Sequence, residues 1–144
     1  MHLTRHTDYG IRILIYLALL PKNEKASIDN ISALYDISRN NVNKIVHQLG
    51  KENIIETRRG KGGGFFLKLA PENIRIGEMI ILMENSLEIV DCETQQCRIV
   101  PACKFKGILN EAKKSFIDTL NKYTLADLME GSRDDLINIF KLSL

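Results

Sequence analysis

The residues of this chain best suited to chemistry are its three cysteines, which all fall within one short segment. Cys92, Cys97 and Cys103 lie in DCETQQCRIVPACKFK, residues 91–106, and no other position of the 144 carries a cysteine. Thiolates bind zinc and iron-sulfur clusters, and thiols also serve as redox switches. Cysteines used only as small apolar side chains would more naturally be scattered through core helices. The clustering therefore predicts metal binding or redox chemistry.

The N-terminal segment bears on whether these thiols could instead form disulfides. The apolar run ILIYLALL, residues 13–20, follows Arg5 and Arg12, but Asp8 interrupts the positive region of a secretory signal and no small-residue cleavage site follows. Its eight apolar residues also fall far short of the roughly 18 that cross a membrane. We therefore expect a buried helix and a cytoplasmic protein without membrane segments, in which an odd number of cysteines argues against a disulfide framework.

The spacing of the thiols, C-x4-C-x5-C, separates the metal alternatives. A four-iron cluster takes one terminal ligand for each iron, preferably a thiolate, and this segment supplies three of them. Structural zinc sites usually contain a ligand pair separated by two to four residues, and a separation of five is loose for that purpose. We favour an iron-sulfur cluster, with zinc and an unmetallated thiol switch as the alternatives.

Upstream of the cysteines, the sequence predicts a helix-turn-helix. Thr4 can cap a first helix that ends near Leu20, and Ser27 can cap a short second helix, IDNISALY. A third helix, about residues 38–51, has apolar side chains at helical spacing and follows the second after about three residues. Its capping and outward-facing side chains suit phosphates and base edges: Ser38, Arg39, Asn40, Asn41, Asn43 and Lys44.

The next segment, IIETRRGKGGGFFLKL, predicts a β-hairpin with a basic tip. Two β-favouring runs, within about residues 54–69, flank glycines and the cations Arg58, Arg59 and Lys61. A nucleotide-binding P-loop would instead open into a helix and end in GK[ST]. A helix-turn-helix followed by a basic hairpin is a winged helix, whose second helix reads the major groove while the wing contacts the backbone or the minor groove. A solvated basic turn beside an ordinary helical hairpin is the alternative.

Charge is distributed unevenly, although the formal net charge is only +2. Residues 38–68 carry seven Lys and Arg against two acids, whereas residues 78–97 carry five acids and no base. The basic middle of the chain suits a polyanion, as the winged helix requires.

Beyond Pro101, apolar residues from Phe105 to Leu120 recur at helical spacing and predict a long amphipathic helix. Twofold proteins read twofold DNA sites, so we expect this helix to pair with that of a second subunit. Packing on its own chain is the alternative. A short helix capped by Thr124 follows.

These elements predict a mainly α-helical fold with a small β-hairpin: a winged helix-turn-helix DNA-binding domain plus a long dimerisation helix. The expected divisions are 1–84 for the DNA-binding domain (recognition helix about 38–51, wing about 54–69), 85–103 for a cluster-binding loop, 101–130 for the dimerisation helix and the short helix, and 131–144 for a C-terminal tail.

Several stretches carry a family resemblance, from Leu3 to about Met129: LTRHTDYGIRILIYLA, RRGKGGGF, IRIGEMI, the cysteine segment with its PAC, and YTLADL. They resemble the winged-helix iron-sulfur regulators, the family that includes IscR. The cysteine spacing and VPAC are most similar to the nitric-oxide-sensitive repressors within it. The resemblance implies that the protein is not an enzyme. It implies a homodimer that binds a pseudo-palindromic double-stranded DNA operator when its cluster is present. DNA binding would be lost when nitric oxide attacks the cluster.

The fourth ligand is where such regulators differ. In IscR-like members a histidine after the third cysteine completes a 2Fe-2S site, but Cys103 is followed by KFKGILNEA, which has none. Asp8 matches an acidic residue of the nitric-oxide-responsive members, and the resemblance implies that it reaches a 4Fe-4S cluster held by the three cysteines of the other subunit. Arg12, one helical turn on, could orient that carboxylate. From the residues alone, Asp8 could instead complement the helix N-terminus, or His6 could be a ligand. His47 is interpreted as packed or close to DNA.

Other functions remain open at this point. One is an IscR-like regulator that senses cluster status or redox state, with 2Fe-2S as the alternative cluster, and another is a zinc or thiol-switch regulator. An electron carrier or enzyme is disfavoured because the sequence has no nucleotide motif and no recognisable set of catalytic residues.

Overall fold

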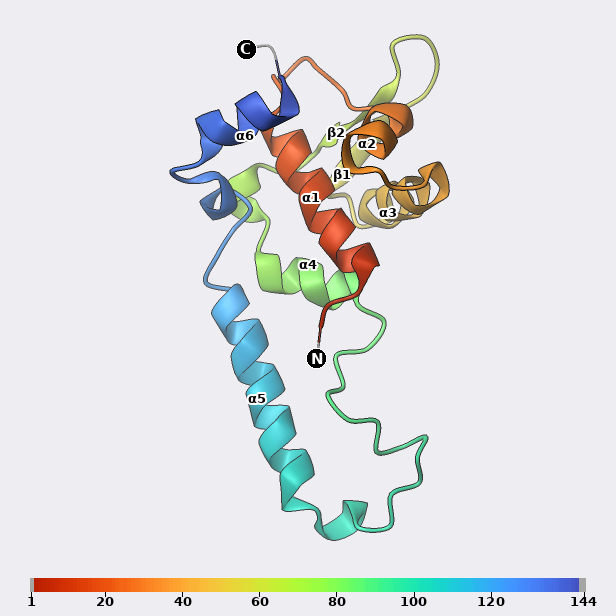
Figure 1. The fold of residues 1–144 in the computed structure, drawn as a ribbon, viewed down its shortest axis with the longest axis vertical. Coiled ribbons are helices and arrows are strands. Elements are labelled where there is room, and N and C mark those ends of the chain that lie inside the picture. The colour runs from red at the N-terminus through yellow and green to blue at the C-terminus, as the bar shows by residue number, and fades with distance from the viewer. Residues whose placement is uncertain (1, 143–144) are drawn as a thin grey trace.

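Helix α1 (Arg5–Leu19) runs through the middle of the main body of the fold (Figure 1). The computed structural model of the chain describes residues 2–142. Thr4 caps α1 by accepting a hydrogen bond from the Thr7 backbone N–H at 3.3 Å, as expected. Ile13 and Leu14 are completely buried, which explains the apolar run at its centre. Within residues 2–142, no helix combines the length and the apolar character that crossing a membrane requires.

The predicted helix-turn-helix is confirmed by α2 (Ile28–Tyr35) and α3 (Arg39–Lys51). Ser27 and Ser38 cap the two helices by accepting hydrogen bonds from backbone N–H groups three residues ahead. Between the helices, Asp36 adopts a left-handed conformation with φ of 52°, which ends α2 and turns the chain. The apolar stripe of α3 is buried as predicted: Val42, Ile45, Val46 and Leu49.

The wing is a hairpin of two antiparallel strands, β1 (Ile55–Arg58) and β2 (Gly64–Leu67). The register pairs Ile55 with Leu67 and Arg58 with Gly64, so both strands lie within the predicted hairpin of about residues 54–69. Phe65 anchors the hairpin in the core with 2% of its surface exposed. A side chain at Gly63 would place its Cβ 2.4 Å from the Arg58 carbonyl oxygen, which explains why the tip needs glycine there.

After a 3₁₀ turn (Pro71–Asn73), the chain forms α4 (Ile76–Met83) and then leaves the body of the fold. It runs out, makes a second 3₁₀ turn (Val100–Ala102), and returns along α5 (Lys104–Leu120), which projects from the body (Figure 1). No residue of α5 is buried. The predicted amphipathic helix is therefore present, and most of its apolar stripe is uncovered by its own chain.

The C-terminal region differs from the sequence-based expectation in two ways. The short helix after Thr124 is only a 3₁₀ turn (Asp127–Met129), and the segment expected to be a tail contains α6 (Arg133–Phe140). Helix α6 packs on α1, where the Phe140 ring meets the Tyr16 ring edge-on at 5.5 Å between centroids. An eight-residue helix is marginal alone and depends on such tertiary contacts, which the local sequence pattern does not reveal.

The close approach of α4 to α5 depends on Gly77. A Cβ at this position would lie 2.3 Å from Asn121 Oδ1 and 2.9 Å from the Ile117 carbonyl oxygen. We expect Gly77→Ala to lower the free energy of unfolding by about 1–3 kcal/mol, because the junction would be overpacked. Thermal and urea unfolding would measure the change.

Gly50→Ala is the matched control, since the nearest atom to its Cβ would be the Ile55 carbonyl oxygen at 3.9 Å. That variant should hold or raise stability, by up to about 1 kcal/mol, because alanine favours helix. Equal destabilisation by both substitutions would contradict the steric explanation.

Candidate nucleic-acid interface and metal centre

The residues predicted to contact DNA from α3 and its N-cap are all exposed: Ser38, Arg39, Asn40, Asn41, Asn43 and Lys44. They lie at the N-terminal end of the helix and away from its buried stripe. Such a face, at the start of the second helix of a helix-turn-helix, is the part that contacts base edges. The fold therefore presents these side chains as the sequence predicted.

A groove joins the recognition helix to the wing. Asn43 and His47 line it from α3, and Arg58 and Arg59 line it from the hairpin. Lys61 is also exposed at the wing tip, although it does not line the groove. His47 therefore faces the surface expected to meet DNA, which agrees with the second of its two interpretations. The combination suits a duplex read by α3 and held by the wing.

Two residues of this surface were not identified by sequence reasoning. The Lys25 ammonium donates a hydrogen bond to the Gly62 carbonyl oxygen at 3.1 Å and so ties the wing loop to the segment before α2. Asp29 lines the groove from the first turn of α2. Lys25 meets the wing loop, and Asp29 meets Arg39 on the next helix. No local motif marks either contact, because each joins two different elements.

Arg59 gives a direct test of the wing. It is exposed and has no ion pair among the described residues, whereas Arg58 pairs with Glu56 at 3.3 Å and lies over the Phe66 ring. We expect Arg59→Ala to reduce the slope of log affinity against log salt by about one, through loss of one phosphate contact.

Titrating labelled DNA at several salt concentrations would measure the slope. Lys122→Ala is the control, because this exposed lysine lies beyond α5, away from the groove. An unchanged slope for Arg59→Ala would show that the wing does not contact phosphates.

The cysteine segment is a series of short turns that ends at α5. The Cys97 N–H donates to the Cys92 carbonyl oxygen at 3.4 Å, and the Cys103 N–H donates to the Val100 carbonyl oxygen at 3.3 Å. Cys103 is the N-cap of α5, where its Sγ accepts from the Lys106 N–H at 3.4 Å. The three thiols are unpaired among the described residues; Cys97 is exposed and the others are partly buried.

These thiols are close in sequence but do not form a ready-made site within one chain. Within residues 2–142, no group of three or more His, Cys, Asp or Glu side chains lies close enough to hold a metal ion. The donor set nevertheless suits iron, because it consists of accessible thiols that no disulfide occupies.

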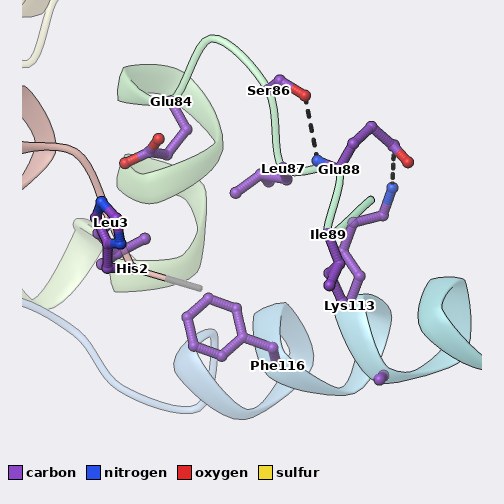
Figure 2. Close-up of a pocket in the computed structure, with 10 residues that line it drawn as sticks. His2, Leu3, Glu84, Ser86, Leu87, Glu88, Ile89, Lys113 and Phe116 are labelled. Atoms are coloured by element: carbon purple, nitrogen blue, oxygen red, sulfur yellow. Dashed lines mark hydrogen bonds and ion pairs between the residues drawn. The ribbon is translucent and has the colours of Figure 1, made fainter. Parts of the chain in front are cut away.

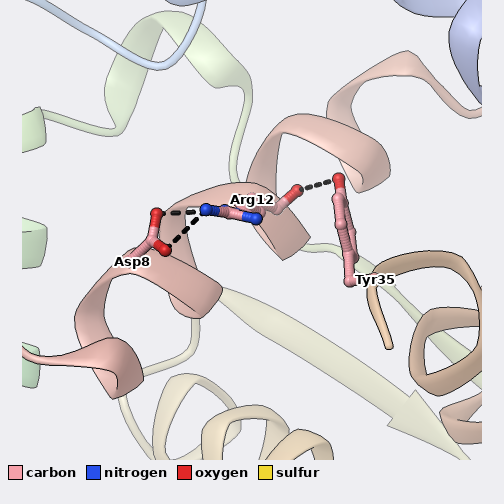
Figure 3. A network of polar contacts seen from close by, with 3 residues as sticks. All are labelled: Asp8, Arg12 and Tyr35. Carbon is pink, nitrogen blue, oxygen red and sulfur yellow. Dashed lines mark hydrogen bonds and ion pairs between the residues drawn. The ribbon is translucent and has the colours of Figure 1, made fainter. Parts of the chain in front are cut away.

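Asp8 forms a two-point ion pair with Arg12 (Figure 3). The Arg12 Nε and Nη2 atoms donate to the two Asp8 carboxylate oxygens at 3.0 and 2.7 Å. Arg12, predicted to lie one helical turn from Asp8, therefore has its guanidinium bonded to the Asp8 carboxylate. The Tyr35 hydroxyl donates to the Arg12 carbonyl oxygen at 2.9 Å, and burial raises the pKa of this phenol, which stays neutral. The Asp8 side chain is 47% exposed, so it remains reachable from outside the chain.

Asp8 and the cysteines of the same chain lie apart. Asp8 is in the first turn of α1, whereas the cysteine segment lies around the far end of α5 (Figure 1). His6, the alternative ligand, is engaged elsewhere. Its Nε2 is 2.7 Å from Gln48 Oε1, and Gln48 Nε2 donates to the Leu82 carbonyl oxygen at 2.8 Å. His6 therefore links α1, α3 and α4 within the body of the fold.

The linker that leads from α4 into the cysteine segment is held against α1 and α5. Glu84 Oε1 accepts from the Thr4 N–H at 2.8 Å and from the Thr4 hydroxyl at 3.0 Å. Partial burial opposes ionisation of Glu84, but hydrogen bonds from Thr7 and Thr4 outweigh it and lower its pKa. Beside it lies a mostly apolar cavity of about 320 Å³, into which Phe116 and Leu87 project (Figure 2). This linker is thus coupled to the helix that carries Asp8.

The chain is similar to known transcriptional regulators over nearly its whole length. A family model for Rrf2, described as an iron-dependent transcriptional regulator, matches residues 3–131. The HTH-type transcriptional regulator NsrR of Halalkalibacterium halodurans is 42% identical, with 99% of each chain covered. The NsrR of Shouchella clausii is 44% identical, covering 93% of this chain and 92% of the relative.

Solved structures agree on the fold. The IscR of T. potens superposes with a TM-score of 0.74 at 22% identity, covering 94% of this chain and 90% of that one. The oxidised form of Staphylococcus aureus CymR has a TM-score of 0.67 at 25% identity, covering 90% and 97%. The winged helix-turn-helix fold is therefore confirmed. The match to a family of transcriptional regulators removes the electron-carrier and enzyme alternatives. This chain is a homologue of NsrR and belongs to the Rrf2 family of iron-dependent transcriptional regulators.

Proposed function

We propose that this protein is a homodimeric iron-sulfur repressor, which binds operator DNA and releases it in response to nitric oxide. The observation that carries the proposal is the placement of its ligands. Three accessible thiols share one projecting segment, while a half-exposed carboxylate, Asp8, lies elsewhere on a helix of the DNA-binding body. Because the three thiols and Asp8 lie apart within one chain, a complete ligand set requires a second subunit. The sequence identity of 42% and 44% to two proteins named NsrR supports nitric oxide as the signal.

Helix α5 supplies the surface for that second subunit. Phe105 and Ile108 are 60% and 61% exposed, and Leu109 and Phe116 continue the apolar stripe while only partly buried. An uncovered apolar helix of this length suits pairing with its own copy about a twofold axis. The divisions that follow are a DNA-binding unit over 1–84, a cluster loop over 85–103, and a dimerisation region over 101–130.

Cys92, Cys97 and Cys103 would hold a 4Fe-4S cluster, with the partner subunit's Asp8 as the fourth ligand. A bound cluster supplies an iron held by oxygen among sulfur-ligated irons, and that weaker, harder ligand gives an incoming small molecule a point of entry. The remaining steps belong to the chain itself. Asp8 is paired with the Arg12 guanidinium in the free chain, so a carboxylate that bound a cluster would have to leave that partner, and this side chain of α1 would change position.

Helix α1 can pass such a change to the DNA-reading elements. It packs directly on α3 and β2, and the His6 to Gln48 contact adds a polar link to α3. In a dimer, the two α3 helices must match half-sites about 34–36 Å apart. A shift of α1 would spoil that match and release the operator, which derepresses the gene in the cytoplasm where the DNA lies.

The proposal is tested on protein purified without oxygen. DNA sites selected by this protein from a random library serve as the probe. About four irons and four sulfides per chain, together with absorbance that bleaches in step with DNA release as nitric oxide is added, would support it. A colourless or zinc-containing protein that binds the same DNA equally well would favour the zinc or thiol-switch alternative. Clustered protein whose DNA binding ignores nitric oxide but follows cluster loading would favour the IscR-like alternative.

A further inference from the structure

The groove expected to hold DNA contains an acidic side chain. Asp29 lines it together with Arg39, Asn43 and the wing arginines. A carboxylate facing a polyanion opposes binding, since it repels phosphates that the surrounding cations attract. Asp29 does not cap α2, because Ser27 accepts the capping hydrogen bond from the Asn30 N–H. Asp29 complements the positive N-terminus of α2 from its first turn, but a carboxylate directed away from the groove would do the same, so its place in the groove needs another reason.

That reason lies in its partner. Asp29 Oδ1 accepts a hydrogen bond from Arg39 Nη1, which joins the first turn of α2 to the first residue of α3. Both side chains are 68% exposed, so the pair contributes little to stability. Even a weak pair favours one conformation of a long, flexible side chain, here at the end of the recognition helix that reads bases.

We propose that Asp29 is a specificity-determining residue, which positions Arg39 for a base edge in the operator. The inference rests on the proposed contact between α3 and DNA. A guanidinium has five N–H donors in a planar fork, so the bond to Asp29 leaves donors for the O6 and N7 acceptors of guanine. Pairing also offsets part of the Arg39 charge, which reduces its attraction to phosphates on any sequence. Asp29 thus lowers non-specific affinity and reserves Arg39 for one base pair.

The test compares Asp29→Asn with Asp36→Asn in the full-length protein. Both changes remove one negative charge from α2 or its end, and Asn tolerates the left-handed conformation of Asp36. Affinity is measured for a selected site and for random-sequence DNA of the same length at one salt concentration. We expect Asp29→Asn to bind random DNA more tightly and the selected site more weakly, lowering the specificity ratio about tenfold. Asp36→Asn should leave that ratio unchanged.

If Asp29 acts only as a surface charge, Asp29→Asn will bind both DNAs more tightly to the same degree and leave the specificity ratio unchanged, and the inference is overturned. A loss of DNA binding caused by misfolding is recognised by comparing melting temperatures. A failure of the proposed function would appear differently, as unaltered protein that does not select any DNA site.

A second measurement asks whether Asp29 works through Arg39. In an Arg39→Ala background, adding Asp29→Asn should no longer change the specificity ratio, because the positioned side chain is gone. A scan of single base-pair changes across the selected site should show that both single variants lose discrimination at the same position. Losses at different positions, or an undiminished effect of Asp29→Asn without Arg39, would overturn the assignment.

Discussion

A Cys97→Ser protein purified without oxygen should lose its cluster absorbance and bind its selected DNA site about 5- to 150-fold more weakly, the usual range of coupling between two sites. Serine keeps the shape of the side chain but replaces a soft thiolate with a hydroxyl, a poor ligand for iron. Cys97 is exposed, so the substitution should leave the fold intact. Iron and sulfide analysis, absorbance and a DNA titration would measure the effects.

Gln95→Ser is the matched control for this change. It introduces the same residue into the same segment at another exposed position, and it should retain both the cluster and the DNA affinity. Equal melting temperatures would show that neither protein is unfolded. A Cys97→Ser protein with a full complement of iron would remove Cys97 from the ligand set and contradict the proposed site.

An Asp8→Ala protein should have a more easily lost cluster, a DNA affinity close to that of cluster-free protein, and a blunted response to nitric oxide. The carboxylate would be absent both as a ligand and as the partner of Arg12. Asp118→Ala is the control, because it breaks an i,i+4 ion pair of the same kind with Lys114 on α5. Both pairs are well exposed, so neither change should greatly affect thermal stability. Unaltered cluster, affinity and response in Asp8→Ala would sink the proposed role.

Mixed dimers distinguish ligation across the dimer from ligation within one chain. When Asp8→Ala and Cys97→Ser chains are co-expressed with different tags, a heterodimer contains one chain with intact cysteines and another with intact Asp8. Ligation across the dimer predicts one complete site with the stability and nitric-oxide response of the unaltered protein. Ligation within one chain predicts none, because neither chain has a full ligand set. The heterodimer spectrum therefore decides between the two arrangements.

Much of this molecule could be predicted from sequence because its signals are local. The capping serines, Ser27 and Ser38, predicted the starts of α2 and α3, and the glycines after Arg59 predicted the wing. Each signal acts within a few residues, through a hydrogen bond to a nearby N–H or a backbone conformation that glycine permits. The Asp8 to Arg12 pair belongs to the same class, since the two residues are one turn apart on a helix.

By itself, the sequence determined the cysteine spacing, the helix-turn-helix with its wing, and the amphipathic character of α5, all of which depend on short-range periodicity and capping. Only the tertiary structure decided that α6 packs on α1, that Asp29 meets Arg39 in the groove, and that the thiols lie apart from Asp8 of the same chain. Each arrangement depends on how the helices are placed relative to one another. Helix α6 packs on α1 because burying apolar faces outweighs local preference, and no local pattern records which faces will meet.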